Sequence, residues 1–126
     1  MGKDGGLGRG KNLKPGGKVK ENYLVVFITA GTSEEAGRIA DILVAERKAA
    51  CVNIVPGVHS KFWWQGEIDS ADEALLIVKT KASLLDELVR LVKENHSYEV
   101  PEVVALPILG GNPDYLKWID EVTSLK

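Results

Sequence analysis

Three side chains in this sequence have the chemistry of metal ligands: Cys51, His96 and Glu102. Thiolate and imidazole groups suit copper and zinc, and a carboxylate can complete a mixed ligand set. Their spacing matches no zinc motif, since the sequence has no C-x-x-C pair and no H-x-x-x-H pair. One cysteine and one histidine cannot fill a tetrahedral site, so a site for Cu²⁺ or another divalent cation would need Glu102 or groups from another subunit.

Each of these residues also has a structural interpretation, which the sequence leaves open. A lone cysteine on a strand commonly serves as a small buried hydrophobe. His96 follows the last turn of a predicted helix, where an imidazolium gains from the helix dipole. The other histidine, His59, is expected to be a solvated residue of a loop.

Signals of catalysis are weak, and we predict that the protein is not an enzyme. The sequence shows no nucleophile elbow, no Ser/His/Asp set and no pair of carboxylates that a pattern singles out. A small hydrolase that uses His96 and a nearby carboxylate is therefore only a minor hypothesis. A phosphate-loop spacing at residues 5–11 lacks the Ser or Thr that should follow, because position 12 is Asn12.

Composition excludes several classes of protein. The chain has 126 residues, 44% hydrophobic and 27% charged, which suits one globular domain. Its longest apolar runs are strand-sized, far short of the roughly 20 residues of a membrane-spanning helix, so we predict no membrane insertion. A single cysteine favours a reducing, cytoplasmic location, and the first residues lack the apolar core of a secretory signal.

The net charge of −2 is unevenly distributed. Residues 1–20 carry six basic groups and one acidic group, whereas the remainder carries ten basic and 17 acidic groups. An acidic domain is a poor ligand for nucleic acid, so we predict no nucleic-acid partner. Residues 1–20 are rich in Gly and Lys and are predicted to form a disordered tail, and residues 21–126 form the domain.

Hydrophobic periodicity predicts the order β-α-β-β-α-β followed by a C-terminal helix. Strands are expected at 23–29, 50–55, 74–80 and 103–109, with an extended arm at 60–65 and a turn at 66–72. Thr32 and Glu35 have capping-box spacing before a helix that reaches about residue 48. Ser83 is expected to cap a helix ending near 95, and Asn112 with Pro113 begins the last helix. This order is an α+β, ferredoxin-like βαββαβ sandwich with a long hairpin.

The predicted sheet is apolar on both faces. In strands 23–29 and 74–80, both alternating sets of side chains are hydrophobic, although the fold places its two main helices on one face only. A face open to water should carry polar residues, and such a patch exceeds what monomers usually expose. We therefore predict association with another subunit, the alternative being that the C-terminal helix covers the face.

Three segments together give the chain a resemblance to a known family. They are AACVNIVPG at 49–57, SKFWWQGEI at 60–68 with LLIVKT at 75–80, and HSYEVPE at 96–102. In this order and spacing they resemble CutA, the divalent-cation tolerance protein, over about residues 22–124. Two positions depart from the usual pattern, since Phe62 stands where tyrosine is common and Ser97 where proline is common.

The resemblance implies a homotrimer with interleaved hairpin arms and a role in tolerance of copper and other divalent metals. It also implies an architecture like that of the trimeric PII signalling proteins. An alternative function follows, in which a small anionic metabolite binds in clefts between subunits, with Trp64, Lys79 and Tyr98 as the ligand-binding residues.

Overall fold

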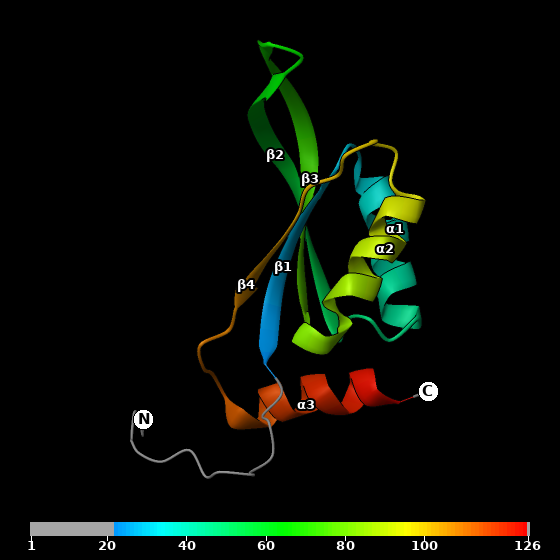
Figure 1. Ribbon diagram of the computed structural model, residues 1–126, viewed down its shortest axis with the longest axis vertical. Helices are drawn as coiled ribbons and strands as arrows, with labels where there is room; N and C mark the ends of the chain where they lie inside the picture. The colour runs from blue at the N-terminus through cyan, green and yellow to red at the C-terminus, as the bar shows by residue number, and fades with distance from the viewer. Residues whose placement is uncertain (1–21, 126) are drawn as a thin grey trace.

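The computed structural model describes residues 22–125, and its elements follow the predicted order (Figure 1). The predicted tail, residues 1–20, lies outside the described residues. The strands are β1 (Tyr23–Ala30), β2 (Cys51–Trp64), β3 (Glu67–Lys81) and β4 (Val103–Pro107). The helices are α1 (Ser33–Ala45), α2 (Leu85–Asn95) and α3 (Pro113–Ser124), with a 3₁₀ turn, η1, at Ala82–Leu84.

The four strands form one antiparallel sheet in the order β2-β3-β1-β4. Helices α1 and α2 pack together on one of its faces (Figure 1). The core lies between them and is made of fully buried aliphatic side chains, which include Val26, Ile28, Ile39, Leu43, Leu76, Val78, Leu88 and Val92. The predicted α+β sandwich with a long hairpin and a C-terminal helix is therefore confirmed.

The second face of the sheet carries no layer of helices within residues 22–125. We call it the open face, and its apolar members on the four strands are Val25, Phe27, Val55, Leu75, Ile77, Val104 and Leu106. Val104 and Leu106 are each 48% exposed. Helix α3 crosses the end of the sheet (Figure 1), where Lys81 of β3 bonds Asp120 at 2.9 Å. The C-terminal helix therefore reaches only one end of the open face and leaves the rest of it uncovered.

The β2–β3 hairpin extends well beyond the helices as an arm (Figure 1). The sequence predicted a break at Pro56–Gly57, but β2 continues through it with a bulge between Val55 and Val58. Gly57 has φ 76°, which a glycine adopts without strain. The turn is also shorter than predicted, because only Gln65 and Gly66 have the positive φ values of a two-residue hairpin turn.

Two helix ends differ from prediction. Helix α1 ends at Ala45 rather than near residue 48, because Arg47 adopts a left-handed backbone (φ 62°) without the glycine that usually marks such an end. The turn η1 precedes α2, so Ser83 is not its N-cap. The caps of α1 and α3 are as predicted: Thr32 accepts from the Glu35 N–H at 3.0 Å, and Asn112 accepts from the Asp114 N–H at 3.1 Å.

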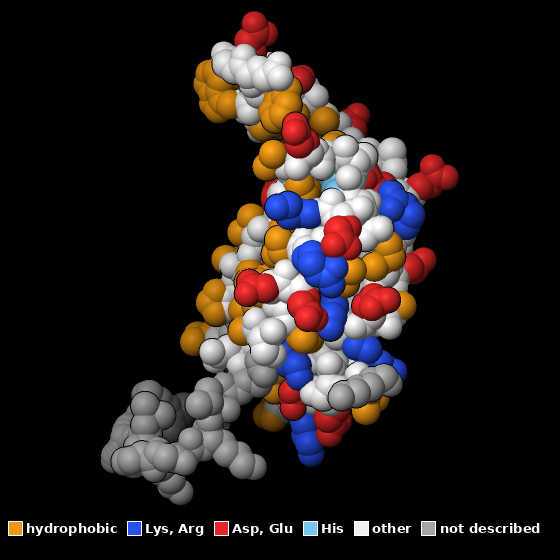
Figure 2. All heavy atoms as spheres, turned by 45° about the vertical axis from the view of Figure 1, so that its right-hand side comes forward, with side chains coloured by type: hydrophobic (Ala, Val, Ile, Leu, Met, Phe, Trp, Pro, Cys, Tyr) orange, Lys and Arg blue, Asp and Glu red, His pale blue; other side chains and the backbone are white. Residues whose placement is uncertain are grey.

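Charged side chains of both signs gather over the helices, whereas hydrophobic ones lie along the opposite margin and the arm (Figure 2). The arm exposes Trp63 (72%), Trp64 (51%) and Ile68. None of the helices between residues 22 and 125 is long and apolar enough to cross a membrane.

Replacing a core residue of β3 should cost far more than truncating an equally apolar surface residue. Leu76→Ala removes a fully buried side chain and should lower the free energy of unfolding by about 3 kcal/mol. Val44→Ala, on the exposed surface of α1, should change it by less than about 0.5 kcal/mol. Urea unfolding at fixed protein concentration tests this, and equal effects of the two changes would contradict the assigned core.

Candidate functional site

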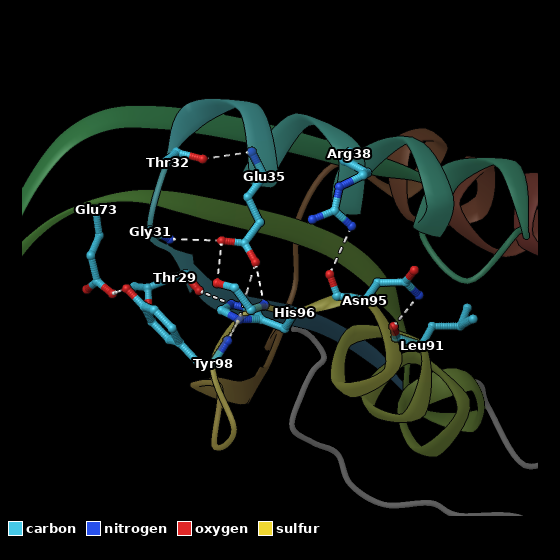
Figure 3. A network of polar contacts seen from close by, with 11 residues as sticks. Thr29, Gly31, Thr32, Glu35, Arg38, Glu73, Leu91, Asn95, His96 and Tyr98 are labelled. Atoms are coloured by element: carbon cyan, nitrogen blue, oxygen red, sulfur yellow. Dashed lines mark hydrogen bonds and ion pairs between the residues drawn. The ribbon is translucent and has the colours of Figure 1, made fainter.

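One group of hydrogen-bonded polar side chains, most of them buried or partly buried, joins the end of β1, the start of α1 and the segment that follows α2. We call Glu35, Glu73, His96, Ser97 and Tyr98 the His96 cluster (Figure 3). Glu35 is 8% and Glu73 9% exposed, and the His96 side chain is fully buried. Burying so many polar groups is costly unless they bond to one another, and the cluster satisfies most of them internally.

Both ring nitrogens of His96 are engaged. Its Nε2 lies 2.7 Å from the carbonyl oxygen of Thr29, to which an N–H must donate. Its Nδ1 accepts the backbone N–H of Tyr98 at 3.0 Å. This pattern places a proton on Nε2 and makes Nδ1 an acceptor, which also lies 3.6 Å from Glu35 Oε2. In this conformation neither nitrogen has a lone pair free for a metal, and the ring bonds Thr29 of β1 rather than a carbonyl of α2.

Glu35 ties the same segment to α1. Its carboxylate accepts the Ser97 N–H at 2.6 Å, the Ser97 hydroxyl at 3.0 Å and the Gly31 N–H at 3.3 Å. Burial alone would raise the pKa of Glu35, but the hydrogen bonds from Ser97, the nearby His96 ring and the hydrogen bond from Gly31 together outweigh it and hold the pKa below its ordinary value. The ionised form of Glu35 is therefore the one that the fold stabilises.

Tyr98 links the cluster to β3. Its hydroxyl donates to Glu73 Oε2 at 2.8 Å, and its ring stacks at a tilt on His96, 4.7 Å between centroids. Burial and the hydrogen bond to the Glu73 carboxylate raise the pKa of Tyr98 to about 12. The phenol therefore remains protonated and acts as a donor at neutral pH.

A second group lies at the other end of the sheet. We call Cys51, Asn53, Lys79 and Tyr115 the Cys51 cluster. The Lys79 ammonium donates to Asn53 Oδ1 and lies 4.0 Å from Cys51 Sγ. Tyr115 of α3 neighbours the thiol, and burial, followed by Cys51, raises the pKa of this tyrosine. Cys51 itself is only partly buried, so its sulfur borders the open face.

The structure does not bring the three predicted metal ligands together within one chain. Cys51 lies opposite Lys79, which lies opposite Val25, whereas His96 bonds Thr29, four residues further along β1. At the rise of a strand this is about 13 Å. Glu102 is exposed just before β4. Among residues 22–125, no three His, Cys, Asp or Glu side chains lie close enough to hold a metal ion.

The predicted ligand-binding residues are also separated. Trp64 lines a hollow at the arm tip with Gln65, Glu67, Ile68 and Asp69, Lys79 belongs to the Cys51 cluster, and Tyr98 belongs to the His96 cluster. A site that uses all three would have to form between chains. His59, expected in a loop, lies instead on β2 and pairs with Asp72 across the arm at 2.8 Å.

Sequence reasoning missed Glu35 and Glu73 as members of a polar cluster. Glu35 was placed only as a capping residue, and its carboxylate bonds Gly31 and Ser97 instead of the Thr32 N–H. Glu73 stood beside a predicted turn. It lies between the turn predicted at 66–72 and the strand predicted at 74–80, where no pattern distinguishes it from a solvated turn residue.

Neutralising Glu35 should weaken the fold and flatten its dependence on pH. Because the pKa of Glu35 is lowered in the folded state, its stabilisation is present above the ordinary carboxyl value of 4.5 and is lost as pH falls below it. Glu35→Gln should cost about 2 kcal/mol at pH 7, since it leaves buried donors poorly paired, and the variant should lose less stability on acidification than the wild type.

Urea unfolding between pH 7 and pH 3, at fixed protein concentration, measures both effects. The exposed neighbour Glu34 is the matched control, and Glu34→Gln should keep the stability at pH 7 within about 0.5 kcal/mol. A Glu35→Gln variant as stable at pH 7 as the Glu34→Gln variant would contradict the role assigned to this carboxylate.

Comparison with known proteins gives close relatives. The chain is 51% identical over 100 residues to "Protein CutA 1, chloroplastic" of Oryza sativa, covering 79% of this chain and 56% of that protein. It is 52% identical over 99 residues to "Divalent-cation tolerance protein CutA" of Thermus thermophilus, covering 79% of this chain and 96% of that protein. The chain thus spans little more than half the length of its plant relatives. None of these names describes a catalysed reaction.

Solved structures agree in fold. The crystal structure of CutA1 from Oryza sativa superposes with a TM-score of 0.78 at 50% identity, covering 80% of this chain and 93% of that one. A CutA from Archaeoglobus fulgidus, described as periplasmic, gives 0.78 at 44% identity and covers 80% and 98%. Because relatives are named for the chloroplast and the periplasm, the cytoplasmic location stays a prediction.

The comparison with protein families covers nearly the whole described domain. Residues 24–122 match the family "CutA1 divalent ion tolerance protein". This range runs from the first strand to the last helix and contains the three segments that carried the resemblance. The chain therefore belongs to the CutA1 divalent ion tolerance protein family.

Proposed function

We propose that this chain forms a homotrimeric divalent-cation tolerance protein that binds Cu²⁺ or a similar divalent ion. The observation that carries the proposal is the family match over residues 24–122, joined to a relative named for divalent-cation tolerance that is covered over 96% of its length.

The open face supports association. Seven apolar side chains share it, and at the β4 edge Val104 and Leu106 are half exposed in the single chain. Burying such side chains is worth about 1.5–3 kcal/mol each, so a surface of this size favours contact with further copies. The exposed tryptophans of the arm suit a subunit interface, where aromatic residues are enriched.

Metal binding would use Cys51 as the soft ligand, with His96 and Glu102 as the other proposed ligands. Because these groups are apart in one chain, a complete site requires ligands from a neighbouring subunit. Engagement of His96 in both of its hydrogen bonds means that it could join a metal only after one bond is broken.

The oligomeric state is tested by a charge placed on the open face. Wild-type protein should sediment with the mass of three 13.7 kDa chains. Val104→Asp should sediment mainly as single chains, because a carboxylate would be buried in the interface without a partner. Val44→Asp, at a similarly exposed position on α1, should remain trimeric. A wild type that sediments as one chain would disprove the trimer.

Copper binding is tested by calorimetry on the wild type and three variants. Cys51→Ser and Glu102→Gln should each weaken Cu²⁺ binding about tenfold or more, since each removes one ligand. His59→Gln, which removes an exposed imidazole, should leave the affinity unchanged and controls for adventitious binding.

Unchanged affinity in both Cys51→Ser and Glu102→Gln would exclude the proposed ligands. A thermal-shift screen discriminates the alternative function, because stabilisation by nucleotides or organic acids, but not by metals, would favour a PII-like regulatory module.

A further inference from the structure

Glu73 is a buried carboxylate whose partners among the described residues are incomplete. It lies on the open-face side of β3, one position before Ala74 of the core, and is only 9% exposed. One oxygen accepts from the Tyr98 hydroxyl at 2.8 Å, and in Figure 3 the other points away from Tyr98. Over residues 22–125 no cation and no second donor contacts Glu73. By contrast, Glu35 is buried to the same extent and accepts three hydrogen bonds.

A buried charge is costly unless a cation or several donors compensate it. The neutral phenol of Tyr98 is one donor, so the Glu73 carboxylate needs a positively charged partner that residues 22–125 of its own chain do not supply. A metal ion suits this position poorly, because the described residues do not supply a third ligand group. A single ammonium group needs only the free carboxylate oxygen.

Lys79 is the complementary group on the same face of the same strand. Its described partners are the amide oxygen of Asn53 and the sulfur of Cys51, and no described carboxylate pairs with it. Lys79 lies six positions after Glu73, which is about 20 Å along a strand. The two charges therefore cannot meet within one chain.

Between them lies the apolar centre of the open face, where Leu75 and Ile77 of β3 are flanked by Phe27. Each chain thus presents an apolar stripe with an acid at one end and a base at the other. Contact between two different patches, repeated around a closed ring, is the geometry of cyclic oligomers. In such a ring the acidic end of one chain can meet the basic end of the next.

We propose that Glu73 of each chain forms a buried ion pair with Lys79 of the neighbouring copy, and that Tyr98 orients the Glu73 carboxylate for it. The pair rests on the proposed trimer and goes beyond it, because it assigns the residues that set the register of the subunits. It would occur once per interface and would select the ring over other ways of burying an apolar face.

A double-mutant cycle tests the pair in the full-length protein. Sedimentation of a dilution series gives the subunit dissociation constant of the wild type, Glu73→Gln, Lys79→Met and the double variant. Glu73→Gln keeps an acceptor for Tyr98, and far-UV circular dichroism checks the fold of every variant. Each single change should weaken association about tenfold or more, because it leaves the other charge buried and unpaired. The double variant should be no weaker than the singles.

Exchanging the charges of Glu73 and Lys79 gives a second test of the ion pair. Glu73→Lys and Lys79→Glu should each prevent assembly, and their combination in one chain should restore it. Glu34→Gln, at an exposed carboxylate of α1 away from the open face and the arm, is the control and should not change the dissociation constant. Additive effects, or no rescue by the exchange, would overturn the pair even if the wild type is trimeric. A monomeric wild type would overturn the trimer and the pair together.

Discussion

The sheet of this chain has two apolar faces and one layer of helices. Helices α1 and α2 bury one face completely, with Ile28, Leu76 and Val78 inaccessible to water. The other face keeps Val104 and Leu106 half exposed, because α3 crosses only the end of the sheet. Since burying apolar area out of water is favourable, this remaining surface is the basis of the proposed association between subunits.

A second constraint acts where the chain passes from α2 to the edge strand β4. Residues 96–102 have no ladder of their own, so their backbone groups need other partners. Glu35 and the His96 ring supply them, by accepting the Ser97 and Tyr98 N–H groups. This places Tyr98 against Glu73. The charge of Glu35 is thus linked through one short segment to the carboxylate at the upper end of the open face.

These two constraints explain why a single chain looks incomplete as a binding protein. Its polar clusters lie at opposite ends of the sheet, and each contains a side chain with an atom that could bind a further partner. Cys51 has a sulfur next to the open face, and Glu73 has an oxygen with no described partner. Both groups border the open face, so in the proposed trimer the partners of Cys51 and of Glu73 would come from a neighbouring copy.

Much of the fold could be predicted from local sequence signals. Runs of β-forming residues, the Thr32 cap and the Asn112–Pro113 start are short-range signals whose physical causes lie within a few residues, and the structure agrees with them. The errors came where a distant contact decides the outcome. The end of α1 at Arg47 has no glycine to mark it, and polar residues of the arm, such as Asp69 and Ser70, are strand residues only because β2 pairs with them.

The candidate site shows the same difference between what short-range sequence signals predict and what distant contacts decide. The sequence by itself determined which residue types are available, namely one thiol, two imidazoles and an apolar stripe that alternates along β1 and β3. Only the tertiary structure decided that His96 spends both nitrogens on backbone groups, that Cys51 and His96 lie at opposite ends of the sheet, and that Glu73 is buried beside Tyr98. Hydrogen bonds between residues dozens of positions apart, such as Ser97 to Glu35, leave no periodic trace in a sequence, because they depend on where the sheet and helices bring the chain together.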